Sequence, residues 1–379
     1  MTAESTPAGD AADSSGGTPP SSGRKAHVRG SEVNPRRVRL EASSHCQLRC
    51  PSCPTTQGKI DAVVGKGVLQ ADAFDRFLAR NPQIVEVELS NWGEILLNPE
   101  LVAIIRLAAE RRVQLTARNG VNFNHARDDV LEAMVVHRFG PITCSIDGAS
   151  QESYSKYRVG GDFDRVLTNI RRLNELKARH DRPEPELTWQ FVVFGYNEHE
   201  IEEARSLATA LGMRFRAKLS WDEELSPVRD PEAVMRATGI AATSRSGYRE
   251  RFGLDYKASI CHQLWDQPMV NWNGRMLGCC ANHWGSFGDR VFDIGLRAAA
   301  NNDRMRYARA MLQGLVPARD DVPCTQCERY VAMQADGTWL RRTTSQRLAG
   351  SWVGSLVDAL RVRRRRFRSQ QPAGNWSGG

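Results

Sequence analysis

Residues 38–53 read VRLEASSHCQLRCPSC, an apolar strand pattern followed at once by three cysteines. Cys46, Cys50 and Cys53 fall within eight residues, and no fourth cysteine is near them. Structural zinc sites use four ligands, whereas a 4Fe–4S cluster can be held by three cysteines with one iron left open. A loop with three idle thiols would be an oxidation liability. We therefore predict that this loop binds metal through all three cysteines.

Downstream of this loop, strand-like runs alternate with helical patterns. Helical patterns over 71–80, 99–112, 127–137, 162–178 and 199–212 separate the successive strands. The strands are VRLEAS (38–43), IVEVELS (84–90), VQLTA (113–117), PITCSID (141–147), LTWQFVVF (187–194) and MRFRAKL (213–219). Repeated βα units imply a parallel sheet, so we predict an α/β fold with a partial (β/α)6 TIM-like barrel over 36–221.

Composition narrows the class of protein. The 379 residues are 41% hydrophobic and contain no run of eighteen apolar residues, which argues against a transmembrane protein. The first thirty residues lack the apolar core of a secretion signal, so we expect a cytoplasmic protein. Nine cysteines in such a chain favour metal or redox use over disulfides.

The net charge of +8 comes mostly from one segment. Residues 361–368, RVRRRRFR, hold six arginines, and the rest of the chain has 46 basic against 44 acidic residues. A nearly neutral body argues against a dedicated nucleic-acid binder, and we expect no specific nucleic acid. Helical spacing over 351–360 before the arginines favours a basic amphipathic helix. This helix would contact an anionic membrane surface peripherally. Alternatively, it would dock on the protein and leave its arginine run in solvent.

Four further segments complete the predicted organisation. Residues 1–35 have the composition of a disordered tail, and 222–255 read as a polar linker with one short helix. Residues 256–335 are rich in cysteine, glycine and tryptophan, which predicts a small domain organised by metal ligands with few long helices. Residues 336–379 form the basic tail.

The three-cysteine loop after the first strand of a six-unit βα run resembles the radical S-adenosylmethionine (radical SAM) superfamily. By the order of its motifs, the resemblance covers roughly residues 38–220. It implies a 4Fe–4S cluster whose open iron chelates S-adenosylmethionine (SAM). One electron, from a donor such as flavodoxin or ferredoxin, would cleave SAM to a 5′-deoxyadenosyl radical that abstracts a substrate hydrogen.

The resemblance also implies residues that bind SAM. The segment SNWGE (90–94) is similar to the family's GGE motif, so Gly93 and Glu94 would bind the methionine ammonium; a plain strand exit is the alternative. Asn119 would face the nucleoside, unless Asn-Gly is only a tight turn. Arg158 would pair with the methionine carboxylate, and a surface arginine on a helix is its alternative.

Alternation along the fourth strand supplies two more candidates. Ser145 and Asp147 share the face that would line the barrel lumen and contact the cofactor, while Cys144 would pack in the core. One departure from the family concerns the residue before the third cysteine, which is usually aromatic and lies near the adenine. Here it is Ser52, so the adenine contact must come from elsewhere.

A second set of cysteines follows the predicted barrel. Its spacing resembles the twitch or shortened SPASM pattern, and four cysteines would hold one auxiliary 4Fe–4S cluster: Cys261, Cys279, Cys324 and Cys327. The Asn-Gly turn in NWNGRML (271–277) favours Cys279 over its neighbour Cys280, although either remains open. A zinc ribbon, as in an interaction protein without enzyme activity, is the alternative for these ligands.

Polar side chains alternate along two predicted barrel strands. Glu86 and Glu88 would give the second strand a polar face suited to a charged cofactor. Arg214, Arg216 and Lys218 on the sixth strand would bind a phosphate or carboxylate of the substrate, or form a solvated edge.

One aromatic segment of the second region, NHWGSFG (282–288), would line the substrate pocket. His283 would then be a polar contact there, and the alternative is that Trp284 and Phe287 form the core of the small domain.

The resemblance to an aminocyclitol dehydrogenase with one auxiliary cluster favours oxidation or other radical modification of a sugar or cyclitol, or of a lipid-linked glycan. The auxiliary cluster would accept the second electron. The alternative enzyme is a peptide or protein side-chain maturase of the SPASM type. The sequence identifies no catalytic base.

Overall fold

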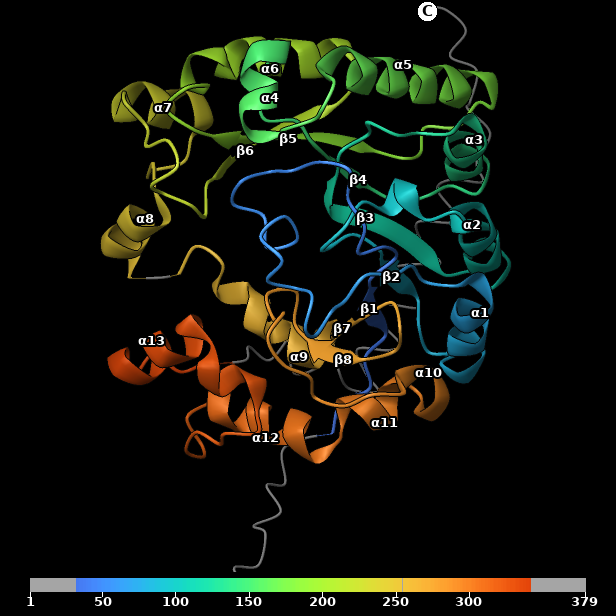
Figure 1. The fold of residues 1–379 in the computed structure, drawn as a ribbon, viewed down its shortest axis with the longest axis vertical. Coiled ribbons are helices and arrows are strands. Elements are labelled where there is room, and N and C mark those ends of the chain that lie inside the picture. Colours follow the sequence, from blue (N-terminus) through green and yellow to red (C-terminus); the bar gives the residue numbers. More distant parts are fainter. Residues whose placement is uncertain (1–31, 254, 342–379) are drawn as a thin grey trace, which may run out of the picture.

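The computed structural model describes residues 32–253 and 255–341 (Figure 1). Its central feature is an eight-stranded sheet with the order β6-β5-β4-β3-β2-β1-β7-β8. The first six strands are parallel to their neighbours and confirm the predicted run of βα units. They are β1 (Arg37–Leu40), β2 (Glu86–Glu88), β3 (Gln114–Val121), β4 (Ile142–Ser145), β5 (Leu187–Val193) and β6 (Arg214–Leu219).

Helices cover the outside of the curved sheet, as Figure 1 shows. The five predicted helices are present, and each presents an apolar stripe to the sheet, such as Phe74, Phe77 and Leu78. They are α1 (Ala71–Arg80), α2 (Leu101–Glu110), α3 (Asp128–Val136), α5 (Phe163–Arg179) and α6 (Ile201–Ala210). A short additional helix, α4 (Gln151–Tyr157), was not predicted.

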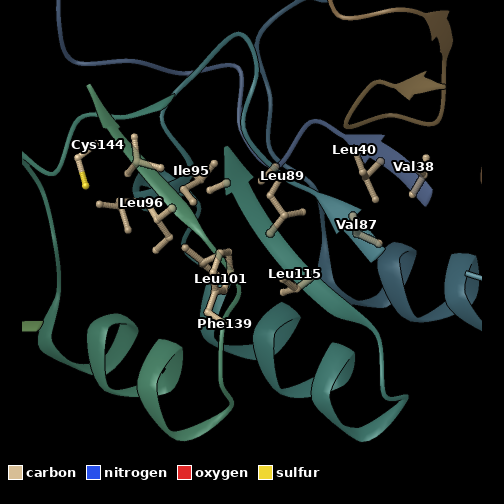
Figure 2. Packing of buried hydrophobic residues seen from close by; sticks show 14 of the residues in the cluster. Val38, Leu40, Val87, Leu89, Ile95, Leu96, Leu101, Leu115, Phe139 and Cys144 are labelled. Atoms are coloured by element: carbon tan, nitrogen blue, oxygen red, sulfur yellow. The ribbon is translucent and has the colours of Figure 1, made fainter. Parts of the chain in front are cut away.

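The main hydrophobic core lies between strands and helices. Figure 2 shows Leu89 and Leu115 from the strands together with Leu101 from α2, all nearly or fully buried. Each fully buried leucine contributes roughly 1.5–3 kcal/mol relative to an exposed one. Cys144 is fully buried in the same core, as strand alternation predicts.

The predicted linker is more helical than the sequence suggested, whereas the region after it has short helices, as expected. Two capped helices lie in the linker: Asp230 and Ser244 accept hydrogen bonds from backbone N–H groups at their N-termini, and each helix ends at a left-handed glycine. They are α7 (Pro231–Thr238) and α8 (Arg245–Phe252). The later helices are α9 (Gln263–Asp266), α10 (Val291–Ile294), α11 (Leu296–Ala300), α12 (Asp303–Leu312) and α13 (Glu328–Asp336).

The C-terminal region continues the barrel sheet. The predicted hairpin forms from β7 (Met269–Val270) and β8 (Met276–Gly278), with Gly274 in the turn at φ +82°. Strand β7 pairs in parallel with β1, and buried residues of this region belong to the same core as the barrel. The two regions therefore share one sheet and one core.

The predicted termini fall mostly outside the described residues. Within the described part, Val33 is buried, and it exchanges two hydrogen bonds with Asn301, of 2.9 and 2.7 Å. The predicted disordered tail therefore does not extend over residues 32–35. The predicted basic helix at 351–368 lies outside the described residues. Among the described helices, none has the length and apolar character needed to cross a membrane.

Candidate functional site

The three-cysteine loop follows β1 and lies at the centre of the ring of strands in Figure 1. Backbone hydrogen bonds hold it there: Arg49 N donates to Val159 O (2.9 Å), and Glu94 N donates to His45 O (2.7 Å). Cys50 is buried, Cys53 is half-buried and Cys46 is exposed. The carboxyl ends of parallel strands are where barrel enzymes place their sites, so the position suits a cofactor.

Two sulfur atoms of this loop accept hydrogen bonds. Asn122 Nδ2 lies 3.8 Å from Cys46 Sγ, and Arg158 Nη1 lies 3.7 Å from Cys50 Sγ. Burial raises the pKa of Cys50, and the positive charge of Arg158 opposes this shift. Donors aimed at sulfur and a positive charge beside it favour thiolate ligands, so this donor set fits an iron–sulfur cluster.

Glu94 and Gly93 lie directly beside this loop. Gly93 packs so closely that a Cβ there would be 2.2 Å from the carbonyl oxygen of Ser43, which requires glycine. The buried Glu94 carboxylate accepts hydrogen bonds from Leu96 N (3.1 Å) and Asn122 N (2.6 Å). Burial raises the pKa of Glu94 to about 7. A cationic amine placed against it would favour the ionised form.

Arg158 is held by Asp147 and is not a surface arginine. Its side chain is 15% exposed, and Asp147 is fully buried. Asp147 Oδ2 accepts hydrogen bonds from Arg158 Nε (2.7 Å) and lies 2.6 Å from Nη2. Its other oxygen accepts from Val192 N (2.7 Å). Asp147 thus positions the guanidinium beside Cys50.

The remaining two candidates lie further along the sheet. Asn119 is exposed; its amide donates to Asn91 Oδ1 (3.2 Å) and its backbone N–H to Ser90 Oγ (3.0 Å). Ser145 is buried on the neighbouring strand, and a Cβ at Gly120 would lie 2.4 Å from its hydroxyl. No contact with the cysteine loop is present for either residue within the described part of the chain.

The acidic side chains of β2 contact the neighbouring strand β3. Glu88 is buried, and its carboxylate accepts hydrogen bonds from Thr116 Oγ1 (2.7 Å) and Arg118 N (2.9 Å) on β3. Glu86 forms an ion pair with Arg118 at 2.9 Å. These contacts join β2 to β3, and the interpretation that this polar face suits a charged cofactor stays a prediction.

Sequence reasoning missed two polar residues at the centre of the site. Glu41 is fully buried and accepts hydrogen bonds from the backbone N–H groups of Trp92 (3.0 Å) and Gly93 (3.3 Å). Burial raises the pKa of Glu41 to about 8. Asn122, already described, links Glu94 to Cys46. Neither belongs to a recognisable local pattern, because both act across the sheet.

Ser52, which replaces the family's aromatic residue, hydrogen-bonds to Asp222 Oδ2 at 2.5 Å. Aromatic side chains instead approach from the end of β5 and from α4. Phe194 and Tyr157 pack with Cys50 in one buried cluster, and their ring centroids are 5.0 Å apart. The cysteine loop is therefore still bordered by aromatic rings.

The second set of cysteines surrounds a small, partly open cavity. Its lining contains the four predicted sulfur ligands and mainly apolar or aromatic neighbours: Cys261, Cys279, Cys324, Cys327, Leu264, Asn282, Trp284, Phe287, Leu312, Pro323 and Tyr330. Within residues 32–253 and 255–341, no group of three histidine, cysteine or carboxylate side chains has the geometry to hold a single metal ion. Four thiols that face one apolar cavity fit a cluster ligand set.

Cys280 does not line that cavity. Its sulfur accepts a hydrogen bond from Gln263 Nε2 (3.3 Å), and its backbone N–H donates to Gln263 Oε1 (2.8 Å). Burial, followed by the neighbouring thiol of Cys280, raises the pKa of Cys279 well above its usual range. The two adjacent cysteines therefore point to different surroundings.

Aromatic contacts connect the two cysteine regions. The His283 ring packs edge-on against Trp92, with centroids 5.4 Å apart, and against Trp284 at 5.1 Å. Trp92 belongs to the segment that contains Glu94, while Trp284 lines the second cavity. Phe287 is buried in the core, so the aromatic segment contributes to packing, while His283 contacts Trp92 and Trp284.

A parallel partial barrel with a three-cysteine loop at the carboxyl ends of its strands defines a radical SAM domain. The sequence model of the radical SAM superfamily matches residues 40–208, so this part of the chain is a radical SAM domain. The protein is therefore a radical SAM enzyme, whose cofactors are a 4Fe–4S cluster and SAM. No protein of curated function matches the sequence.

Two solved structures have a fold similar to that of this chain, and a third resembles it more weakly. Streptococcus suis SuiB bound to S-adenosylmethionine has a TM-score of 0.56 and 13% identity, covering 78% of this chain and 71% of that one. The anSMEcpe structure with bound AdoMet has a TM-score of 0.51 and 13% identity, covering 78% and 86%. The structure of BtrN in complex with AdoMet and 2-DOIA has a TM-score of 0.41 and 14% identity, covering 78% of this chain and 93% of that one. At these identities the likeness concerns the fold alone.

Proposed function

We propose that this radical SAM enzyme oxidises, or otherwise modifies at carbon, a sugar- or cyclitol-type substrate and uses an auxiliary 4Fe–4S cluster as electron acceptor. The observation that carries the proposal is the shared cavity of Cys261, Cys279, Cys324 and Cys327. A second redox group is needed when hydrogen abstraction is followed by loss of one more electron. When bound, the first cluster supplies the electron that cleaves SAM.

The chain's own residues have distinct tasks in this proposal. Cys46, Cys50 and Cys53 hold the first cluster. Arg158, fixed by Asp147, offers a bidentate fork to the methionine carboxylate, because a planar guanidinium matches carboxylate geometry. Their placement within one buried network gives the cofactor a single orientation.

The methionine ammonium is assigned to the other side of the loop. Glu94 offers a carboxylate there, and its two backbone donors keep the side chain oriented toward the loop. The contacts from Trp92 through His283 to Trp284 supply a packed route for the second electron toward the four-cysteine cavity.

A second candidate is modification of a peptide or protein side chain. SuiB, whose fold is similar, has been solved bound to its precursor peptide SuiA. A short precursor-peptide gene beside this one would favour that candidate, whereas a cluster of sugar or polysaccharide genes would favour the first. A zinc ribbon in the C-terminal region remains the metal alternative.

The test is anaerobic reconstitution with metal analysis and assay of SAM cleavage. We expect iron and sulfide near eight each per chain and reductive formation of 5′-deoxyadenosine. Replacing Cys46, Cys50 and Cys53 with alanine should abolish cleavage and leave about four irons. Cys144→Ala is the matched control, because that thiol is buried in the core. Undiminished cleavage in the triple variant would refute the ligand assignment, and zinc in the triple variant would refute the auxiliary cluster.

A further inference from the structure

A cluster of cations lies on the side of the partial barrel beyond its last parallel strand. Arg216 and Lys218 come from β6, Arg245 begins α8, Lys257 precedes α9, and Arg329 lies on α13. Figure 1 shows α8 between the β6 side of the barrel and α13. Five basic residues thus come together from segments that are up to about a hundred residues apart.

Several contacts hold the members of this cation cluster together. Arg245 Nη2 donates to Leu219 O, the residue after Lys218, at 3.4 Å. The Arg245 and Lys257 cationic groups lie over the same ring, Tyr256, at 5.5 and 5.7 Å from its centroid. Arg216 Nη2 donates to Gln190 Oε1 at 2.9 Å, which fixes the other end of the cluster on β5.

Few acids balance these charges. Asp147 already pairs with Arg158, and Asp255 lies 3.5 Å from Arg329. Glu223 accepts hydrogen bonds from two backbone N–H groups at the start of α8. The ammonium groups of Lys218 and Lys257 have neither an ion pair nor a hydrogen bond within the described part of the chain.

Two further features indicate that the cation cluster binds an anion. The Nε atom of Arg245 is buried without a hydrogen-bond partner. Burial, followed by repulsion from Lys257 and Arg245, lowers the pKa of Lys218 to about 7. Burial and neighbouring cations lower the pKa of Lys257 and of Arg245 as well. Crowded, half-buried cations are stabilised when an anion of two or more charges binds among them.

We infer that Lys218, Lys257 and Arg245 bind a phosphoryl group of the substrate. The inference rests on the proposed function and deepens it, because it makes the substrate a phosphorylated small molecule. A phosphate dianion with three acceptor oxygens suits donors that arrive from three segments, whereas a carboxylate suits one planar fork. Lys218 stands opposite Val192 in the β5–β6 pairing, and Val192 N donates to Asp147 Oδ1, so the rest of a substrate anchored here extends toward the SAM site.

The experiment measures binding of inorganic phosphate to the reconstituted full chain by calorimetry at constant ionic strength, with malonate as a carboxylate of equal charge. We expect saturable phosphate binding that is at least tenfold tighter than malonate binding. Lys257→Gln should weaken it by about tenfold or more, and Lys257→Arg should retain it. Arg214→Gln is the matched control: the strand alternation groups Arg214 with Lys218, but its side chain is 76% exposed and pairs with Glu186 at 3.2 Å, outside the cation cluster.

Each outcome bears on the inference. Absence of saturable phosphate binding, equal binding of malonate, or equal weakening by Arg214→Gln would overturn it. The same preparations are assayed for SAM cleavage without substrate, so failure of the proposed function is read separately. Intact cluster absorbance in Lys257→Gln, with normal cleavage, shows that the variant is folded and that its binding loss is local to the cation cluster.

Discussion

Replacement of Asp147 by asparagine tests whether a buried ion pair positions the SAM-binding arginine. Asp147 is fully buried and receives two contacts from Arg158, at 2.7 and 2.6 Å, and one from Val192 N at 2.7 Å. Asparagine keeps the volume and can still accept from Val192. It removes the negative charge, so the largely buried guanidinium loses its counter-ion.

The size of the effect follows from this burial. Breaking a buried ion pair by neutralising one partner costs about 3–5 kcal/mol, because the other charge stays buried and uncompensated. For a chain of this size, each kcal/mol of lost stability lowers the thermal unfolding midpoint by about 2 °C. The midpoint of the apoprotein should therefore fall by roughly 5–10 °C. Affinity for SAM should fall about tenfold or more, since Arg158 no longer has a fixed orientation.

Thermal unfolding and equilibrium SAM binding give the two readouts. The matched control is Asp128→Asn, which removes an ion pair of the same 2.6 Å length with Arg172 on the surface. Asp128 is 68% exposed, so its loss should cost at most about 1 kcal/mol and leave SAM binding unchanged. Equal midpoints for the two variants, together with unchanged SAM affinity in Asp147→Asn, would refute the positioning argument.

Three further predictions address other parts of the site. Glu94→Gln should weaken SAM binding about tenfold with a normal cluster spectrum, because a charged hydrogen bond contributes about 1.5–3 kcal/mol; a change within twofold would exclude this acid. Cys279→Ala should lower iron to near that of the first cluster alone while Cys280→Ala retains both clusters, and the reverse pattern would contradict the cavity assignment. The pKa of Lys218 is about 7 in the folded state and about 10.4 in the unfolded chain, so between these pH values the unfolded chain binds one proton more. The free energy of unfolding should therefore rise with pH between about 7 and 10.4, by up to about 1.4 kcal/mol per pH unit. Lys218→Met should flatten that rise in thermal midpoints measured at pH 7 and 9, and identical slopes would contradict the shift.

The barrel could be predicted because its information is local. Each of the six strands is an apolar or alternating run, and each of the five predicted helices repeats its apolar residues every three or four positions. The cysteine loop was recognisable from spacing alone. Helices α7 and α8 were underestimated because they are short and polar, although their capping residues Asp230 and Ser244 were visible in the sequence.

The centre of the site depends on contacts that spacing does not encode. Glu41 reads as one polar residue in a strand, and its role arises only because Trp92 and Gly93 turn their N–H groups toward it. The basic alternation of β6 similarly suggested either a ligand site or a solvated edge. Only the approach of Arg245 from the predicted linker, and of Lys257 from the start of the segment after it, distinguishes Lys218 from an ordinary edge residue.

The pairing of β7 with β1 determines how the two cysteine regions lie relative to each other. In this register Leu40 stands opposite Val270, so the hairpin that leads to Cys279 starts beside the strand that leads to Cys46. The carbonyl of Cys280 accepts a hydrogen bond from Asn91 Nδ2 at 3.4 Å, next to the Trp92–His283 contact. Because sheet hydrogen bonds and a common core fix this arrangement, the separation of the two sites is a property of the fold. Electron transfer between them would therefore not require a domain to move.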